Sequence, residues 1–153
     1  MRRLIFLLAA FTFAAASHAQ DTPRDTVDAL FEAMRAGDGD AVLDLVADGA
    51  PLMRVEAEGN VRDSAFEDWA AWVSVQNDGD ADEQTFAVSE RIHGDLASVW
   101  APFILYYKGE LVGCGVNQFT LAREKDAWTI IHGIDTQDSG DCATFKDRYE
   151  AAN

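Results

Sequence analysis

The last third of the chain, residues 99–136, limits the possible folds more than any other part of the sequence. It contains three apolar segments, VWAPFILYY, LVGCGVNQFTLA and AWTIIHGIDT, with short polar turns around Lys108-Gly109 and between Glu124 and Asp126. Such a density of aromatic and β-branched residues is typical of strands. Loops of two and three residues are typical of hairpins. We therefore expect three consecutive antiparallel strands.

The first half of the chain carries helix signals. Thr22 and Pro23 are suited to start a helix that ends at Gly37, and apolar residues recur within it at helical spacing. A short second helix should follow Asp38 or Asp40. A capping box formed by Ser64 and Glu67 predicts a third helix.

Two further strands are expected between and after these helices. Residues 52–57 should form an edge strand, and residues 84–92 a strand that precedes the final three. Helices followed by antiparallel strands indicate the α+β class, with three helices packed on one curved antiparallel sheet in a half-open cone.

Residues 1–19 have the pattern of a signal peptide. Arg2 and Arg3 precede the apolar run from Leu4 to Ala16, which is too short to span a bilayer, and small residues precede Gln20. An uncleaved membrane anchor is the alternative, but no stop-transfer pattern follows the run. We therefore expect export to the periplasm and a single domain at 20–153.

The charge of the chain is strongly acidic. Its 27 Asp and Glu residues against 12 Lys and Arg give a net charge of −15, and cleavage would remove two more positive charges. Such a surface repels phosphate backbones and anionic membranes. We therefore expect no nucleic-acid partner and no membrane partner after cleavage, and the simplest role of the charge is solubility.

Cys114 and Cys142 are the only cysteines. In an oxidising compartment they can form a disulfide, which would close a loop of 28 residues and add about 3 kcal/mol of stability. Two free thiols, with Cys114 packed in the core, are the alternative.

Turn lengths predict how the three strands pair. The first turn would place Val99 opposite Gln118, and the second would place Gln118 opposite His132. One face of the sheet would then carry Gln118 and His132 together with Phe103, Val116, Trp128 and Ile130. The opposite face would carry Trp100, Tyr106 and Phe119, an apolar patch that predicts a homodimer. Coverage of this patch by residues 137–153 is the alternative.

These segments resemble the nuclear transport factor 2-like superfamily. The likeness is carried by VWAPFILYYKGELVGCGVNQFTL and AWTIIHGIDT, and it covers residues 22–136. Within the superfamily the chain is similar to small exported proteins labelled SnoaL-like or lumazine-binding. The resemblance implies a ligand cavity between the concave sheet and the helices. It does not imply one activity, because ketosteroid isomerase, scytalone dehydratase, polyketide cyclases and non-enzymes share this fold.

Gln118 and His132 are the main catalytic candidates in that cavity. His132 could act as a general acid or base, with Gln118 orienting it or the substrate. The alternative is a Gln–His hydrogen bond that satisfies both groups inside the core. Trp69 and Trp72 could line the pocket, and we expect one of them there and the other in the core.

The remaining polar residues suggest less specific roles. Arg54 could bind an anionic ligand at the cone mouth, although pairing with Glu56 or Glu58 is the alternative. Asp135 is expected at a solvated strand end. The Asp78-x-Asp80-x-Asp82 segment lacks the glycine and the final glutamate of a calcium loop, so we expect no metal site there.

No cofactor motif is present in the sequence. The leading expectation is therefore a protein that binds a small, mostly apolar molecule. The alternatives are a cofactor-free isomerase, dehydratase or hydrolase that uses His132 with Gln118, and a non-catalytic structural or interaction protein.

Overall fold

The computed structural model describes residues 22–152, so the predicted signal peptide at 1–19 lies outside the described residues. The helices are α1 (Pro23–Ala36), α2 (Gly39–Leu43), α3 (Phe66–Val73) and α4 (Phe145–Ala152), with short 3-10 turns at Ala57–Gly59 and Cys142–Thr144. The strands are β1 (Leu52–Val55), β2 (Val61–Arg62), β3 (Ala81–Thr85), β4 (Ser89–His93), β5 (Leu96–Tyr107), β6 (Glu110–Glu124) and β7 (Ala127–Gln137).

The sequence signals at α1 are confirmed. Thr22 and Asp25 form a reciprocal capping box, Pro23 occupies the first turn, and Gly37 closes the helix in the left-handed conformation. Asp38 caps α2 by accepting a hydrogen bond from the Ala41 backbone N–H.

The predicted start of α3 is wrong. Its N-cap is Ala65, and no side chain caps it, so the box between Ser64 and Glu67 does not form. Glu67 instead accepts a hydrogen bond from the Gly49 backbone N–H at 2.9 Å. A long-range contact has therefore replaced the local one.

One mixed sheet holds the molecule together. The strand order is β2-β1-β7-β6-β5-β3, and β4 also pairs with β5. All neighbours are antiparallel except β1 and β7, which run parallel. Because β2 continues the sheet beyond β1, the predicted edge strand is an inner one. The single strand expected at residues 84–92 is interrupted, so that β3 and β4 pair with different stretches of β5.

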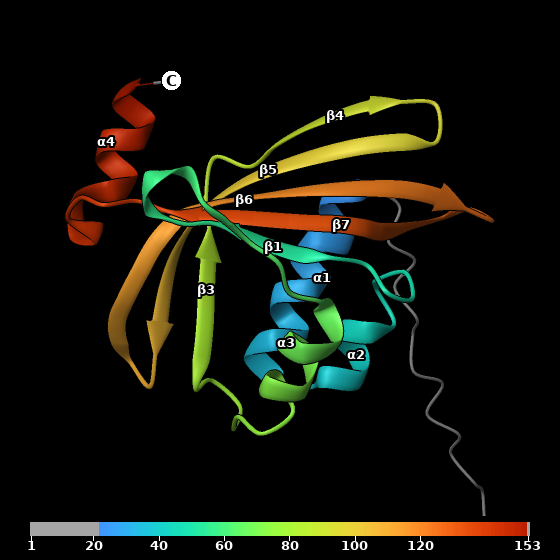
Figure 1. Ribbon diagram of the computed structural model, residues 1–153, viewed down its shortest axis with the longest axis horizontal. Coiled ribbons are helices and arrows are strands. Elements are labelled where there is room, and N and C mark those ends of the chain that lie inside the picture. Colours follow the sequence, from blue (N-terminus) through green and yellow to red (C-terminus); the bar gives the residue numbers. More distant parts are fainter. Residues whose placement is uncertain (1–21, 153) are drawn as a thin grey trace, which may run out of the picture.

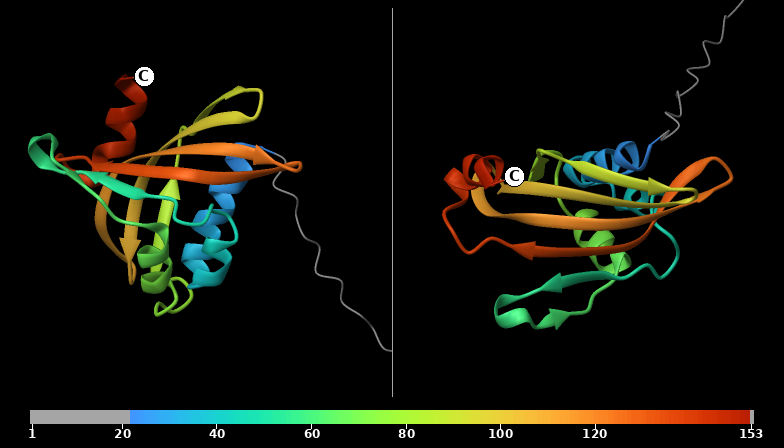
Figure 2. Two further views of the ribbon diagram at one scale, coloured as in Figure 1. Left: turned by 45° about the vertical axis from the view of Figure 1, so that its right-hand side comes forward. Right: turned by 90° about the horizontal axis from the view of Figure 1, so that it is seen from above.

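The helices lie on both sides of this sheet. Helices α1, α2 and α3 gather on the concave side, where β5 and β6 curl around them, while α4 stands on the opposite side (Figures 1 and 2). The α+β cone expected from the sequence is thus present, with a C-terminal helix that was not predicted. None of the helices in residues 22–152 is long and apolar enough to cross a membrane.

A β-bulge in β6 alters the predicted pairing with β5. The strands pair at Tyr106 and Leu111 as the turn length predicts, but Leu105 then pairs with Gly113 and leaves Val112 as an extra residue. From there on the register is shifted by one, so Trp100 rather than Val99 lies opposite Gln118. Because side chains alternate, this shift exchanges the two faces of β6.

The pairing of β6 with β7 differs from the prediction at the turn and at a second bulge. Glu124 pairs with Ala127, so the turn has two residues rather than the three predicted. Leu121 pairs with Ile130, but Thr120 pairs with His132, so Ile131 is the extra residue. Gln118 therefore lies opposite Ile134, and the predicted Gln118–His132 pair does not form. Beyond Ile131 the faces of β7 are exchanged as well.

The core lies on the concave face and follows from this register. Phe119 is only 3% exposed and packs edge-on against Phe31 of α1, with ring centroids 6.0 Å apart. Gly133 lies opposite Phe119, and a Cβ there would be 2.8 Å from the ring of Phe66. The missing side chain thus allows α3 to approach the sheet closely.

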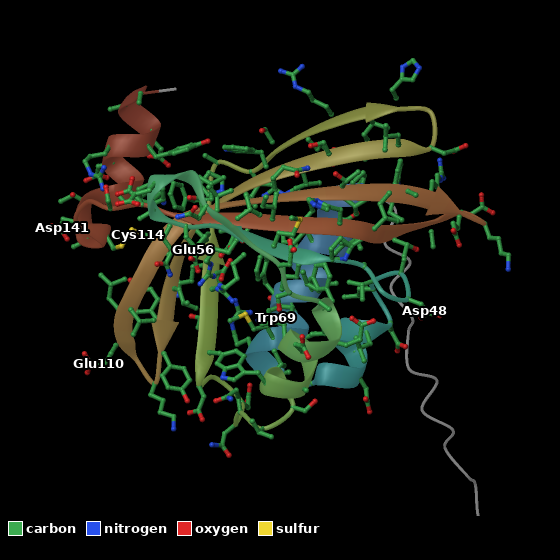
Figure 3. All side chains as sticks on the ribbon, viewed as in Figure 1. Asp48, Glu56, Trp69, Glu110, Cys114 and Asp141 are labelled. Atoms are coloured by element: carbon green, nitrogen blue, oxygen red, sulfur yellow. A yellow bond between two sulfur atoms is a disulfide. The ribbon has the colours of Figure 1, made fainter. Side chains whose placement is uncertain are left out.

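The C-terminal segment covers part of the convex face. Cys114 and Cys142 are joined by a disulfide, the option favoured by the sequence over two free thiols (Figure 3 labels Cys114). Phe145 and Tyr149 of α4 pack edge-on against Phe86. The covering tail, one alternative in the sequence, is therefore present at this end of the sheet.

The predicted dimer patch changes in composition. Phe119 belongs to the core, because the bulge in β6 turns it inward. Trp100 remains on the convex face, 44% exposed, and donates a hydrogen bond to the Tyr149 hydroxyl at 2.9 Å. A homodimer through this face stays a proposal, which a monomeric mass in light scattering at micromolar concentration would refute.

Candidate ligand pocket

A pocket of about 530 Å³ opens between the concave face of the sheet and helices α1 and α3. Its volume is within the range of small-molecule sites. It is lined by Leu30, Phe31, Leu52, Met53, Arg54, Arg62, Ser64, Phe66, Asp68, Trp69, Trp72, Glu83, Asn117, Phe119 and Asp135. The pocket therefore combines an aromatic wall with a group of charged residues.

The polar part of the pocket forms a row across the sheet. Arg54 of β1 lies opposite Asp135 of β7, and Asp135 lies opposite Asn117 of β6. Neighbouring residues at matched register positions point to the same face. All three therefore project toward the helices, because the two bulges place Asn117 and Asp135 on the concave side.

Asp135 and Arg54 form an ion pair. Arg54 donates from Nε to both carboxylate oxygens, at 2.9 and 3.0 Å, and from Nη2 to Oδ2. The Asp135 side chain is 11% exposed and that of Arg54 is 36% exposed. The carboxylate raises the pKa of Arg54 through these hydrogen bonds. Asp135 is thus a paired group in the pocket, which corrects its expected place at a solvated strand end.

Glu83 of β3 completes the polar group. Its Oε1 accepts a hydrogen bond from Asn117 Nδ2 at 2.5 Å. Burial of the carboxyl group raises the pKa of Glu83 to about 7, and the negative charge of Asp135 acts in the same direction. The Asn117 hydrogen bond and the charge of Arg54 act in the opposite direction without cancelling the rise. Near neutral pH, Glu83 can therefore hold or release a proton.

The opposite wall is aromatic. Trp69 of α3, labelled in Figure 3, packs edge-on against Phe66 with ring centroids 6.1 Å apart. Trp72 lies one turn further along, 41% exposed and beside the ring of Tyr107. Both tryptophans line the pocket, whereas the sequence predicted one there and one in the core.

Four of the predicted pocket residues do not line the pocket. Phe103, Trp128 and Ile130 are buried in the core of the domain. Val116 lies on the convex face, opposite Pro102, as a result of the bulge in β6. The pocket is bounded by β1, β6 and the second half of β7 rather than by the start of β7.

His132 and Gln118 lie on the face opposite the pocket. Gln118 donates from Nε2 to the Ser98 hydroxyl, to the Phe119 carbonyl and to the Thr120 hydroxyl, at 2.8–3.2 Å. His132 lies opposite Thr120 and is partly exposed. The two side chains are not brought together, and neither reaches the cone.

Other candidate charges have protein partners. Arg62, not Arg54, pairs with Glu56, at 2.8 Å. In the acidic loop, Asp80 accepts hydrogen bonds from Asn77, and Asp82 pairs with Arg35 at 2.6 Å. Within residues 22–152, no cluster of three or more His, Cys, Asp or Glu side chains could hold a metal ion.

The sequence did not point to Glu83 or Asn117 as site residues. Glu83 lies just before the strand expected at residues 84–92, whereas β3 begins at Ala81 and directs Ala81 and Glu83 to the same side. The sequence offered no clear signal for Glu83, because the burial of Ala81 on the same side of the strand is visible only in the structure. Asn117 directly precedes Gln118, so the predicted pairing places it on the face opposite Gln118, away from the expected cavity; the bulge at Val112 turns it toward the pocket.

Comparisons by sequence found no relative. No family model matches the chain, and no curated protein matches it. A comparison of structures, in contrast, found many solved proteins that are similar to this chain.

Three solved structures illustrate the likeness. An NTF2-like protein with a cystatin-like fold from Novosphingobium aromaticivorans is 15% identical, with a TM-score of 0.59 over 78% of this chain and 82% of that one. An NTF2-like protein of unknown function from Silicibacter pomeroyi is 18% identical, with a TM-score of 0.58 and coverages of 75% and 92%. A Streptomyces avermitilis protein of the NTF2-like family, whose name proposes a dehydratase, is 18% identical, with a TM-score of 0.57 and the same coverages.

Identities below 20% show a shared fold and leave the activity open. The TM-scores of 0.57–0.59 over three quarters or more of this chain indicate the same overall arrangement of backbone. The chain therefore has the nuclear transport factor 2-like, cystatin-like fold.

Proposed function

We propose that the protein binds a small, mostly apolar molecule in the pocket between the sheet and the helices. The observation that carries the proposal is one pocket of about 530 Å³ with Trp69 and Phe66 on one side and the Glu83–Asn117 pair on the other. An aromatic wall with a few convergent polar groups is typical of ligand sites. An unfilled space of this size also favours binding over a purely structural role.

Export to the periplasm is part of the proposal. It is supported by the Cys114–Cys142 disulfide, because such bonds persist in oxidising compartments and are rare in the cytoplasm. Pulse labelling and fractionation of the full-length chain would test it, since export predicts cleavage near Gln20.

Binding can be tested with a neutral fluorescent probe, 2-naphthalenemethanol. Trp72→Ala removes an aromatic wall at the pocket, and Trp100→Ala removes a similarly exposed tryptophan from the convex face. We expect Trp72→Ala to weaken binding about fivefold or more, because aromatic contacts contribute about 1 kcal/mol, and Trp100→Ala to leave it unchanged. Equal losses in the two variants, or no binding by the wild type, would contradict the proposal.

A second candidate function is proton transfer by Glu83. It is favoured by one observation, a carboxyl group with a pKa of about 7 in a pocket that also holds Asp135 and Arg54. A general acid or base works best when its pKa is near the working pH. The cofactor-free isomerase or dehydratase considered from the sequence would then use Glu83 in place of His132.

This candidate can be tested by deuterium exchange. A base that removes a proton from the carbon next to a carbonyl and returns it would exchange that position in D₂O. Small apolar ketones can be incubated with wild type, Glu83→Gln and Glu83→Asp, and followed by NMR. Exchange that is lost in Glu83→Gln and partly kept in Glu83→Asp supports proton transfer. Exchange that persists unchanged in Glu83→Gln excludes Glu83 as the base.

A further inference from the structure

Two arginines lie side by side at the pocket. The antiparallel pairing of β1 with β2 places Arg54 directly opposite Arg62, and both line the pocket. Like charges on directly opposite residues destabilise a sheet. In a chain with 27 acidic and 12 basic residues, two adjacent cations are also unusual. An anion bound between the two guanidinium groups would be attracted by both and would offset their mutual repulsion.

Each arginine still has donors to offer. Arg54 uses Nε and Nη2 for Asp135, and Arg62 uses Nε for Glu56. Within residues 22–152, Nη1 of Arg54 and both terminal nitrogens of Arg62 make no hydrogen bond to the protein. Planar guanidinium groups bind carboxylates through parallel N–H···O bonds.

We propose that the ligand of this pocket is an apolar carboxylic acid whose carboxylate binds between Arg54 and Arg62 while its apolar body lies against Trp69 and Trp72. The assignment rests on the proposed binding function and adds the chemical class and orientation of the ligand. Desolvation of the hydrocarbon supplies most of the affinity, and the arginines select the charged end.

The surrounding charges favour a single negative charge on the ligand. Asp135 and Glu56 each accept from one arginine, so the arginines keep only part of their positive field. Asp68 and Glu83 also line the pocket and would repel a doubly charged phosphate more strongly than a carboxylate. A cationic ligand bound in the same position would be repelled by the two guanidinium groups.

Three matched probes can test the assignment on the full chain at pH 7.5. They are 2-naphthoate, 2-naphthalenemethanol and 2-naphthylmethylammonium, which share one ring system and carry a negative, a neutral and a positive group. Arg62→Gln removes one cation, and Arg24→Gln is the matched control. Each of these arginines is 52% exposed and pairs with a carboxylate that is 47% exposed, but Arg24 lies on α1 and does not line the pocket.

We expect naphthoate to bind about tenfold more tightly than the alcohol, because its carboxylate can accept charge-assisted hydrogen bonds from the arginines. Arg62→Gln should remove most of this preference and leave the affinity for the alcohol unchanged. Arg24→Gln should change neither affinity.

Other outcomes would overturn the assignment. If the alcohol binds as tightly as naphthoate, if the ammonium probe binds best, or if Arg62→Gln weakens all probes equally, the carboxylate site is wrong while binding in the pocket stands. If wild-type protein binds none of the three probes at millimolar concentration, the proposed binding function fails as well.

Discussion

The polar residues on the two faces of the sheet differ in their surroundings and in their hydrogen-bond partners. On the concave face, Glu83, Asn117 and Asp135 are gathered beside an apolar core, and they bond to one another or to Arg54. On the convex face, Gln118 bonds to its immediate neighbours Phe119 and Thr120 and to Ser98 across the strand pair, and His132 lies partly exposed.

This difference separates a site from a surface. Buried polar groups that converge on a pocket can interact strongly with a ligand, because desolvation strengthens their hydrogen bonds and charge interactions. Polar groups satisfied within a strand pair mainly support the sheet. The pocket is therefore assigned to the concave face, and the convex face to tail attachment.

The largest expected effect tests which face holds the core. Phe119→Ala should lower the free energy of unfolding by about 3–5 kcal/mol, because it opens a cavity beside Phe31. Trp100→Ala should cost about 1 kcal/mol, since Trp100 is exposed and loses mainly one hydrogen bond. Urea denaturation of both variants measures the difference. A Trp100→Ala cost equal to that of Phe119→Ala would refute the observed register.

The local patterns of the sequence predicted the elements better than their alignment. Features that depend on neighbours in the chain could be predicted from the sequence. They are the capping at Thr22, the helical spacing of α1 and the strand segments after Val99. The first hairpin was also paired correctly next to its turn, at Tyr106 and Leu111.

The errors came from how neighbouring strands align, because the turn after Glu124 has two residues rather than the three predicted and each hairpin contains a bulge. Val112 and Ile131 are extra residues in their strands, and nothing in the apolar pattern marks them, because Leu111 and Ile130 directly before them are also apolar. Each bulge reverses the faces beyond it. Because neither bulge was foreseen, the sequence pattern placed His132 in the expected site and left Asn117 out of it. Of the two tryptophans of α3, one was expected at the pocket, and both line it.

The next effect concerns attachment of the tail to the convex face. Replacing both Cys114 and Cys142 with alanine should lower the free energy of unfolding by about 3 kcal/mol. The disulfide joins residues 28 positions apart and so restricts the unfolded chain. Dithiothreitol should destabilise the wild type similarly and leave the double variant unchanged. Mass spectrometry of the non-reduced protein provides the check, since two free thiols would contradict the bond.

The pH dependence of stability tests the concave face. The pKa of Glu83 is about 7 in the folded state and has its ordinary value of 4.5 when unfolded. Between these values the folded protein keeps a proton that the unfolded chain releases, so stability falls as the pH rises through this window. The full loss is at most on the order of 3 kcal/mol by pH 8.

Glu83→Gln should remove this loss, because glutamine cannot ionise and retains an oxygen to accept from Asn117. The stability of the variant relative to wild type should therefore rise steadily from pH 4.5 to 8. Glu110→Gln, at the exposed end of the first hairpin (Figure 3), is the control. Parallel curves for wild type and Glu83→Gln would show that the carboxyl group is ordinary.

The smallest expected effect is at His132. His132→Ala should change the free energy of unfolding by less than about 1 kcal/mol, as expected for a partly exposed side chain. Binding of 2-naphthalenemethanol should stay within twofold of wild type, because His132 does not line the pocket. Trp72→Ala, measured beside it, should lose affinity. If His132→Ala weakens binding as much as Trp72→Ala does, the convex face contributes to the site and the division between the two faces is wrong.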